Sequence, residues 1–97
     1  MIDIAKLQRV LGYQFRDVSL LIRSITHRSY GKPNNERMEF VGDGILDYVI
    51  ALYLYDNFPD MPEGDLSKVR ASLVNQSSLV DLAISINLGE YLLLGDG

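Results

Sequence analysis

The stretch of residues 35–58, NERMEFVGDGILDYVIALYLYDNF, determines how the rest of this chain is expected to fold. Its apolar residues recur at helical spacing, which predicts one long helix over the whole stretch. Beyond the first turns, apolar side chains cover nearly the full circumference of that helix. This pattern is typical of a buried central helix, so we expect the other helices to pack around it.

Four acidic side chains lie on one stripe of this helix, within an arc of roughly 80°: Glu36, Glu39, Asp43 and Asp47. One interpretation is that this end of the helix lies in solvent, where acids in the first turn complement the helix macrodipole. The other interpretation starts from repulsion. Carboxylates about 6 Å apart repel by roughly 3 kcal/mol per pair at an effective dielectric constant near 20, and a divalent cation would offset this.

Glu39 and Asp43 are the pair best placed to bind one cation, because residues at i and i+4 differ by a rise of about 6 Å. Glu36 lies about 10.5 Å from Asp43 along the axis, so it can only support such a site. Gly42 and Gly44 flank Asp43, and each interior glycine costs about 1 kcal/mol relative to alanine. We expect them either to permit close approach of a backbone or ligand, or to reflect loose packing against a small neighbour.

Residues 35–46, NERMEFVGDGIL, resemble the signature of the ribonuclease III family of double-stranded-RNA endonucleases, which is close to N-E-R-L-E-F-L-G-D-S-x-L. The segments LGY (11–13), THRS (26–29) and PEGDLSKVRASLV (62–74) resemble the family in the same order. Gly44 departs from the signature, where a small residue, most often Ser, is usual. We expect this change to weaken the helix locally without removing a metal ligand.

The resemblance implies Mg²⁺-dependent hydrolysis of phosphodiester bonds in double-stranded RNA, as in the processing of rRNA and mRNA precursors, with Mn²⁺ as the alternative ion. It implies that Glu39 and Asp43 bind the metal and that Glu36 and Glu63 support catalysis. In the family a later D-x-x-E segment completes the metal site, and a C-terminal domain binds double-stranded RNA. We therefore expect residues 1–97 to be the N-terminal part of the catalytic domain, inactive in isolation.

Phe40 lies beside the acidic stripe, at about 40° from Glu36. From spacing alone, an intramolecular helix is expected to cover its ring. In the resembled family, however, this Phe contributes to a symmetric dimer interface. The resemblance thus predicts a homodimer with residues 35–58 near the two-fold axis.

Two other function classes are compatible with parts of the sequence. One is a catalytically silent module of the same fold that serves in assembly or RNA scaffolding, which the missing acid pair would explain. The other is a di-iron carboxylate bundle, which requires inward-facing Glu-x-x-His motifs. Residues 36–39 read Glu-Arg-Met-Glu, with Glu where His is needed, and this disfavours the second class.

Composition narrows the chemistry further. The 97 residues are 47% hydrophobic and contain no cysteine, which excludes disulfides, thiolate zinc sites and a cysteine nucleophile. Residues 1–32 carry a net charge of +4 and residues 33–97 a net charge of −8. Such an acidic chain binds nucleic acid weakly by itself, so much of its affinity for RNA must come from another module or from metal ions. The longest apolar run, at 48–55, is too short to span a bilayer, and we expect no membrane association and a cytoplasmic protein.

No strand-like alternation persists, so the fold class is all-α, with about five helices around the central one. We expect Asp3 and Gly12 to bound the first helix, residues 17–26 to form the second, and Asn35 to cap the central helix. Asp65 is expected to cap the fourth helix.

A fifth helix should follow NQSS at 75–78 and end at Leu88-Gly89, after which the tail EYLLLGDG has no partner. His27 is the only histidine, and no orienting partner is apparent, which favours a polar structural contact over catalysis.

Overall fold

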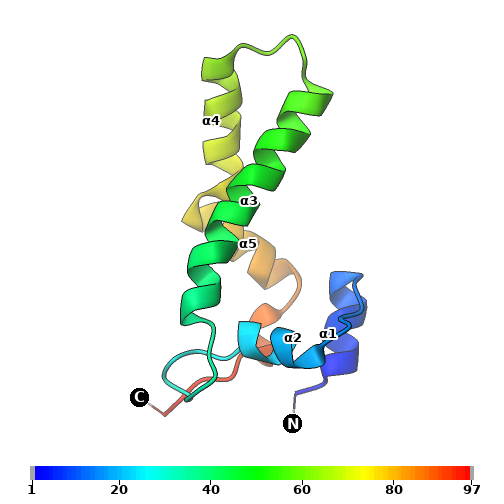
Figure 1. Ribbon diagram of the computed structural model, residues 1–97, viewed down its shortest axis with the longest axis vertical. Coiled ribbons are helices and arrows are strands. Elements are labelled where there is room, and N and C mark those ends of the chain that lie inside the picture. Colours follow the sequence, from blue (N-terminus) through cyan, green and yellow to red (C-terminus); the bar gives the residue numbers. More distant parts are fainter. Residues whose placement is uncertain (1, 97) are drawn as a thin grey trace.

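The computed structural model describes residues 2–96, which form five α-helices and one short 3-10 helix, η1 (Figure 1). Their bounds are α1 Ile4–Leu11, α2 Val18–Ser24, α3 Glu36–Asn57, α4 Glu63–Val74, α5 Gln76–Ser85 and η1 Leu88–Tyr91. Within residues 2–96 the extended pairing consists of a single parallel bridge between Thr26 and Leu93. The predicted all-α class with five helices is therefore confirmed.

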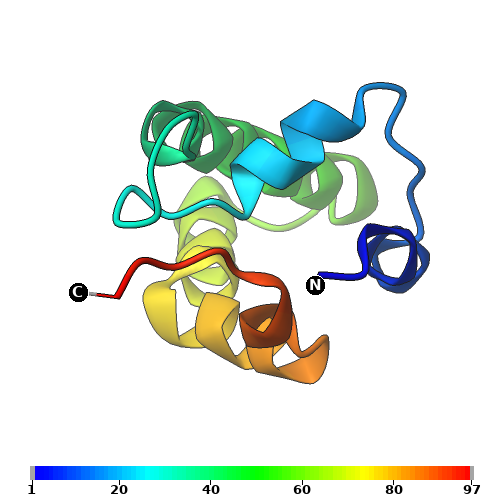
Figure 2. The same ribbon diagram turned by 90° about the horizontal axis from the view of Figure 1, so that it is seen from below.

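Two regions differ in shape and packing. Helices α3 and α4 run side by side in opposite directions as a long arm, and α1, α2 and the chain end form a base below it (Figure 1). The molecule is accordingly elongated, with extents of 48 × 28 × 22 Å. Seen from below, the chain end returns past the end of α2 (Figure 2).

The buried core lies in the base and joins segments from both ends of the sequence. Its buried side chains are those of Leu7, Leu21, Ile25 and Tyr91. Leu88 and Leu92 are partly buried against this cluster. The expectation that the tail from residue 90 has no partner is therefore wrong, because Tyr91 is part of the core and the adjacent backbone is paired with residues 25–27.

Local capping explains where the first two helices begin and end. The Asp3 carboxylate accepts a hydrogen bond from the Lys6 amide at 2.9 Å, and Gly12 ends α1 in the left-handed conformation with φ 68°. Asp17 caps α2 through the Ser19 amide at 3.0 Å. Helix α2 ends at Ser24 rather than at Thr26, because Thr26 joins the bridge to the chain end.

The N-cap of α3 is the predicted residue without the expected capping bond, and the N-cap of α4 is a different residue from the predicted one. Asn35 occupies the N-cap position of α3, but its side-chain amide donates to the Ser24 carbonyl at 2.9 Å, and the Asn34 side chain accepts from the Glu36 amide instead. Asp65 does not cap α4. Pro62 is itself the N-cap residue, with extended backbone (φ −62°, ψ 153°), so α4 begins at Glu63 and Asp65 lies in its first turn.

Helix α5 also starts earlier and ends earlier than expected. Asn75 caps it through the Ser78 amide at 2.8 Å, so the polar residues after Asn75 lie inside the helix. The helix ends at Ser85, and Asn87 adopts a left-handed conformation with φ 54° before η1 begins.

The prediction that α3 is a buried central helix is wrong for the described residues. Leu54 is the one buried residue of α3, at 3% exposure, whereas the Phe40 ring is 85% exposed. Helix α4 packs along one side of α3, and within residues 2–96 no other helix covers the opposite side to a similar extent. Apolar residues around a helix show what it can bury, but they do not show which partner covers them.

Candidate active site

The acidic stripe starts where α3 is fixed to the base. The Asn35 amide donates to the Thr26 carbonyl at 2.9 Å, and the Arg23 Nε donates to the Asn34 carbonyl at 2.8 Å. With the Asn35 side chain bonded to Ser24, these contacts hold the first turn of α3 against the end of α2. The positions of Glu36 and Glu39 therefore depend on the contacts between the first turn of α3 and the end of α2.

Glu36 and Glu39 lie in the first turn of α3, and Asp43 and Asp47 follow on the next turns. All four side chains are exposed, which leaves their carboxylates accessible to a cation or to substrate. Near the first turn is a hollow of about 260 Å³, lined by His27, Arg28, Asn35, Glu36 and Glu39. The structure thus brings two of the predicted acids together with one imidazole and one guanidinium.

Glu63 lies elsewhere within one chain. It begins α4 at the far end of the arm, and the 22 residues of α3 span about 33 Å from the acidic first turn to that end (Figure 1). A single chain therefore does not bring Glu63 to Glu36 and Glu39.

The donor set partly fits a magnesium ion. Carboxylate oxygens are the ligands that Mg²⁺ prefers, and Mg²⁺ commonly keeps several waters while it binds one or two carboxylates. Glu39 and Asp43 can supply such a pair. Among residues 2–96, however, no three or more His, Cys, Asp or Glu side chains come together as a metal site. Glu39 and Asp43 therefore remain a candidate pair for such an ion.

The two glycines beside Asp43 have no close neighbour. Apart from its chain neighbours and the backbone of its own helix, a Cβ atom built at Gly42 or Gly44 would meet no atom within 4 Å among the described residues. The expected close approach of another backbone is therefore not provided by this chain.

Sequence reasoning missed the pairing of Gly95 with Ser29, which contacts His27, one of the residues that line the hollow. The Gly95 amide donates to Ser29 Oγ at 3.0 Å, and a Cβ at Gly95 would lie only 2.0 Å from the Ser29 carbonyl oxygen. Ser29 in turn contacts the ring of His27, whose Nδ1 lies 2.7 Å from Ser29 Oγ. The predicted polar contact of His27 is thus confirmed, and its partner is the Ser of the THRS segment.

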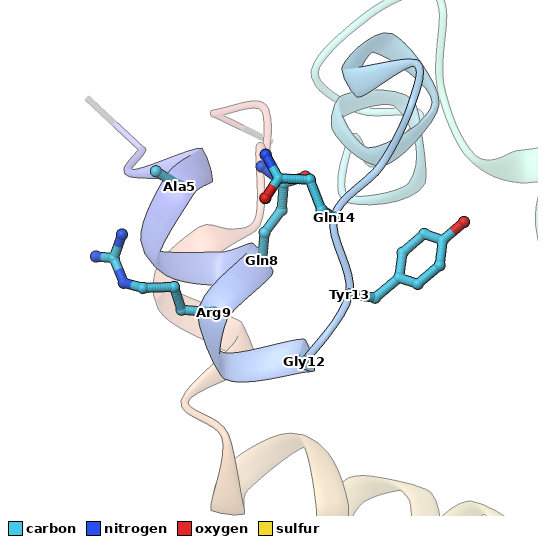
Figure 3. Close-up of a pocket in the computed structure, with 6 residues that line it drawn as sticks. All are labelled: Ala5, Gln8, Arg9, Gly12, Tyr13 and Gln14. Atoms are coloured by element: carbon cyan, nitrogen blue, oxygen red, sulfur yellow. The ribbon is translucent and has the colours of Figure 1, made fainter.

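A second hollow, of about 580 Å³, lies at the end of α1 and is lined by residues 5, 8, 9 and 12–14 (Figure 3). Arg9 and Tyr13 point away from one another there, and no acid lines the space. The Gln8 side chain accepts a hydrogen bond from the Phe15 amide at 2.7 Å, which holds the loop after α1. This hollow therefore has a structural explanation and offers no metal ligands.

A larger groove, of about 890 Å³, follows the N-terminal half of α3 and includes the Phe40, Val41 and Ile45 side chains. It lies next to the acidic first turn, because Glu36 lines both this groove and the smaller hollow. In addition, none of the helices formed by residues 2–96 has the length and apolar character needed to cross a membrane.

Comparison with known proteins agrees with the signature and the fold. A family model described as Ribonuclease-III-like matches residues 17–97. Ribonuclease 3 of Dechloromonas aromatica is 56% identical over 87 residues, which cover 90% of this chain and 39% of that protein. Ribonuclease 3 of Chromobacterium violaceum is 52% identical over 92 residues, which cover 95% of this chain and 39% of that protein.

Solved structures agree as well. The nuclease domain of ribonuclease III from Campylobacter jejuni superposes with a TM-score of 0.89 and 48% identity, covering 97% of this chain and 66% of that chain. The present chain spans about two fifths of the length of the curated relatives. With the signature at 35–46, the all-α architecture and these matches, this chain belongs to the ribonuclease III family.

Proposed function

We propose that this chain is part of a metal-dependent endoribonuclease that hydrolyses phosphodiester bonds of double-stranded RNA. The observation that carries the proposal is the stripe of exposed carboxylates on the first turns of α3, within a family signature and beside a hollow that also contains His27 and Arg28. Several relatives are named Ribonuclease 3, which supports the same reaction class.

Each residue of the site would have its own role, according to its position on α3 or in the hollow. Glu39 and Asp43 would hold the cation, and Glu36, one turn earlier, would orient the groups around it. When bound, Mg²⁺ supplies positive charge for the scissile phosphate and activates water for attack. Arg28 would contribute a permanent positive charge to the same hollow, where it can contact a phosphate oxygen.

We also propose that the chain works as a homodimer. The Phe40 ring is 85% exposed and lines the apolar groove along α3, and a large exposed apolar surface favours association. A solved Campylobacter jejuni relative is described as having a region involved in dimer formation of its nuclease domain. The intramolecular cover for Phe40 that spacing alone favoured is absent from residues 2–96.

A two-fold dimer would also give Glu63 a place near the site. If two α3 helices pair in opposite directions, the end of the arm on one chain reaches the acidic first turn of the other. Glu63 at the start of α4 would then approach Glu36 and Glu39 across the interface. In this arrangement Glu63 would support the site of the other chain, although it lies far from the acids of its own chain.

The direct test of the function is Asp43→Asn in a full-length ribonuclease that contains this chain. We expect loss of double-stranded RNA cleavage with RNA binding largely intact, because the substitution removes a ligand charge and keeps the shape of the side chain. Asp81→Asn, an exposed acid on α5, is the matched control and should cleave normally. Ordinary turnover by Asp43→Asn at usual magnesium concentrations would refute the assignment.

A second candidate is a silent module that binds RNA or assembles without cleaving it. It is favoured by the lack of a complete cluster of metal-binding side chains within residues 2–96. The same experiment separates the two functions, because a silent module binds double-stranded RNA and cleaves none with either Mg²⁺ or Mn²⁺.

A further inference from the structure

A chain of hydrogen bonds connects the end of the molecule to the only histidine. The Gly95 amide donates to Ser29 Oγ at 3.0 Å, and Ser29 Oγ lies 2.7 Å from His27 Nδ1. The Ser29 amide also donates to His27 Nδ1, at 3.1 Å. The backbone supports this arrangement, because the His27 amide donates to the Leu93 carbonyl at 2.9 Å.

These contacts favour a proton on one of the two ring nitrogens. A backbone amide can only donate, so His27 Nδ1 must accept, and a neutral imidazole with an accepting Nδ1 carries its proton on Nε2. With Nδ1 as an acceptor, Ser29 Oγ accepts from Gly95 and donates its own proton to Nδ1, which it shares with the Ser29 amide. The sequence of donors, from Gly95 to Ser29 to His27, thus favours a single tautomer.

The His27 ring lines the hollow of about 260 Å³ together with Arg28, Glu36 and Glu39. Among residues 2–96, Nε2 has no hydrogen-bond partner, so its proton is available to a ligand. Nε2–H and the Arg28 guanidinium are both donors, which favours a negatively charged oxygen as the ligand when a cation offsets the charges of Glu36 and Glu39.

We propose that His27 donates a hydrogen bond from Nε2 to a phosphate oxygen of the RNA, and that Ser29 and Gly95 are positioning residues that fix the ring for this contact. The inference rests on the proposed function, because it places an RNA phosphate beside the acids of α3. Ser29 touches no substrate in this scheme. Its effect passes through the orientation and tautomer of His27.

The first test is nuclear magnetic resonance of the imidazole nitrogens in the 97-residue chain, where a single histidine gives a single set of signals. We expect the wild type to show the Nε2–H tautomer. Ser29→Ala should raise the proportion of the other tautomer by about 2- to 10-fold, the equivalent of one ordinary hydrogen bond. Ser29→Thr, which keeps the hydroxyl, should restore the wild-type ratio.

Ser85→Ala is the matched control, because its Oγ donates to the Leu82 carbonyl within α5 and does not contact His27. A wild-type ring in the other tautomer, or equal ratios in the wild type and Ser29→Ala, would overturn the role of Ser29. Neither measurement depends on RNA cleavage, so a failure of the proposed function is distinguishable from a failure of this inference.

The second test adds inorganic phosphate with Mg²⁺ and follows the same His27 signals. We expect the Nε2–H resonance to shift saturably in the wild type and in Ser85→Ala, and to shift less in Ser29→Ala. No shift of the wild-type resonance at any phosphate concentration that leaves the fold intact would overturn the contact with phosphate.

Discussion

The base and the arm of this molecule use similar apolar helices for different purposes. In the base, Leu7 is completely buried in a core built from both ends of the sequence. In the arm, α3 is almost three times as long as α1, yet Leu54 is its one buried residue. The base therefore supplies most of the enclosed apolar packing of this chain. The apolar surface of the arm remains available for association.

The difference between base and arm shows that apolar periodicity predicts helices but does not predict which surfaces cover them. Both regions have apolar residues at helical spacing, and both form the helices that this spacing predicts. Only the base contains its own partner surfaces within residues 2–96. The contrast between the two regions can be measured as changes in the free energy of unfolding, in dimer dissociation and in magnesium affinity, with the largest change expected in the base.

The largest difference should appear when a leucine is truncated in each region. Leu7→Ala removes a fully buried side chain from the base, and we expect it to lower the free energy of unfolding by about 2–5 kcal/mol. Leu52→Ala on α3, where the side chain is 45% exposed, should cost about 1 kcal/mol or less. Urea denaturation of both variants measures the contrast, and equal losses would show that the arm is packed as tightly as the base.

Alanine at a glycine should have opposite effects in the two regions. Gly95→Ala places a Cβ 2.0 Å from the Ser29 carbonyl oxygen, and we expect it to displace the chain end and destabilise the protein by about 1–3 kcal/mol. Gly42→Ala meets no atom within 4 Å and should stabilise α3 by about 0.5–1 kcal/mol. Thermal unfolding of the two variants measures whether each change in stability is positive or negative. A destabilising Gly42→Ala in the dimer would instead reveal a close neighbour at that position across the interface.

Phe40→Ala tests whether the arm is an association surface. We expect the dimer dissociation constant to rise roughly tenfold, about 1.4 kcal/mol, with little change in the stability of the monomer, because the ring is exposed within one chain. Sedimentation equilibrium is the measurement. A wild-type monomer near 10.9 kDa at tens of micromolar protein would contradict the dimer, as would a Phe40→Ala variant that dimerises unchanged.

The smallest effect should be that of magnesium on the isolated chain. Glu39 and Asp43 replace few of the waters of the ion, so we expect millimolar affinity or weaker. At a concentration equal to the dissociation constant, Mg²⁺ would then stabilise the chain by only about 0.4 kcal/mol. Isothermal titration measures the affinity. Micromolar binding would mean that further acids, such as Glu36, Glu63 or those of a second chain, close the site.

Predictions that depend on neighbouring residues succeeded most often. Asp3 and Gly12 bound α1 as expected, because a cap involves only the next few backbone groups. Asp65 failed as a cap because the helix already begins after Pro62. Asn35 is the N-cap residue of α3 as predicted, but it makes no capping hydrogen bond because its side chain bonds to Ser24 instead. In the last case the competing partner lies 11 residues away, beyond the reach of a local pattern.

The stripe of acids on α3 could be recognised from the sequence because a helix fixes the relative positions of residues four apart. The proximity of Ser29 to Gly95 could not be recognised, since it depends on the return of the chain over 66 residues. Nor could the exposure of α3, because periodicity does not identify a partner surface.

The pairing of Gly95 with Ser29 also sets an order for the synthesis of this protein. The helical hairpin of α3 and α4 involves contacts between neighbouring segments, so it can form as soon as those segments have left the ribosome. The THRS segment, by contrast, is synthesised early, and Gly95, which donates to Ser29, is added 66 residues later. Until then Ser29 has no amide from Gly95 to accept, and Tyr91 has not yet filled the core between Leu7 and Ile25. A nascent chain therefore carries the acidic helix for some time before Leu93 and Gly95 are available to hold His27 and Ser29 in place.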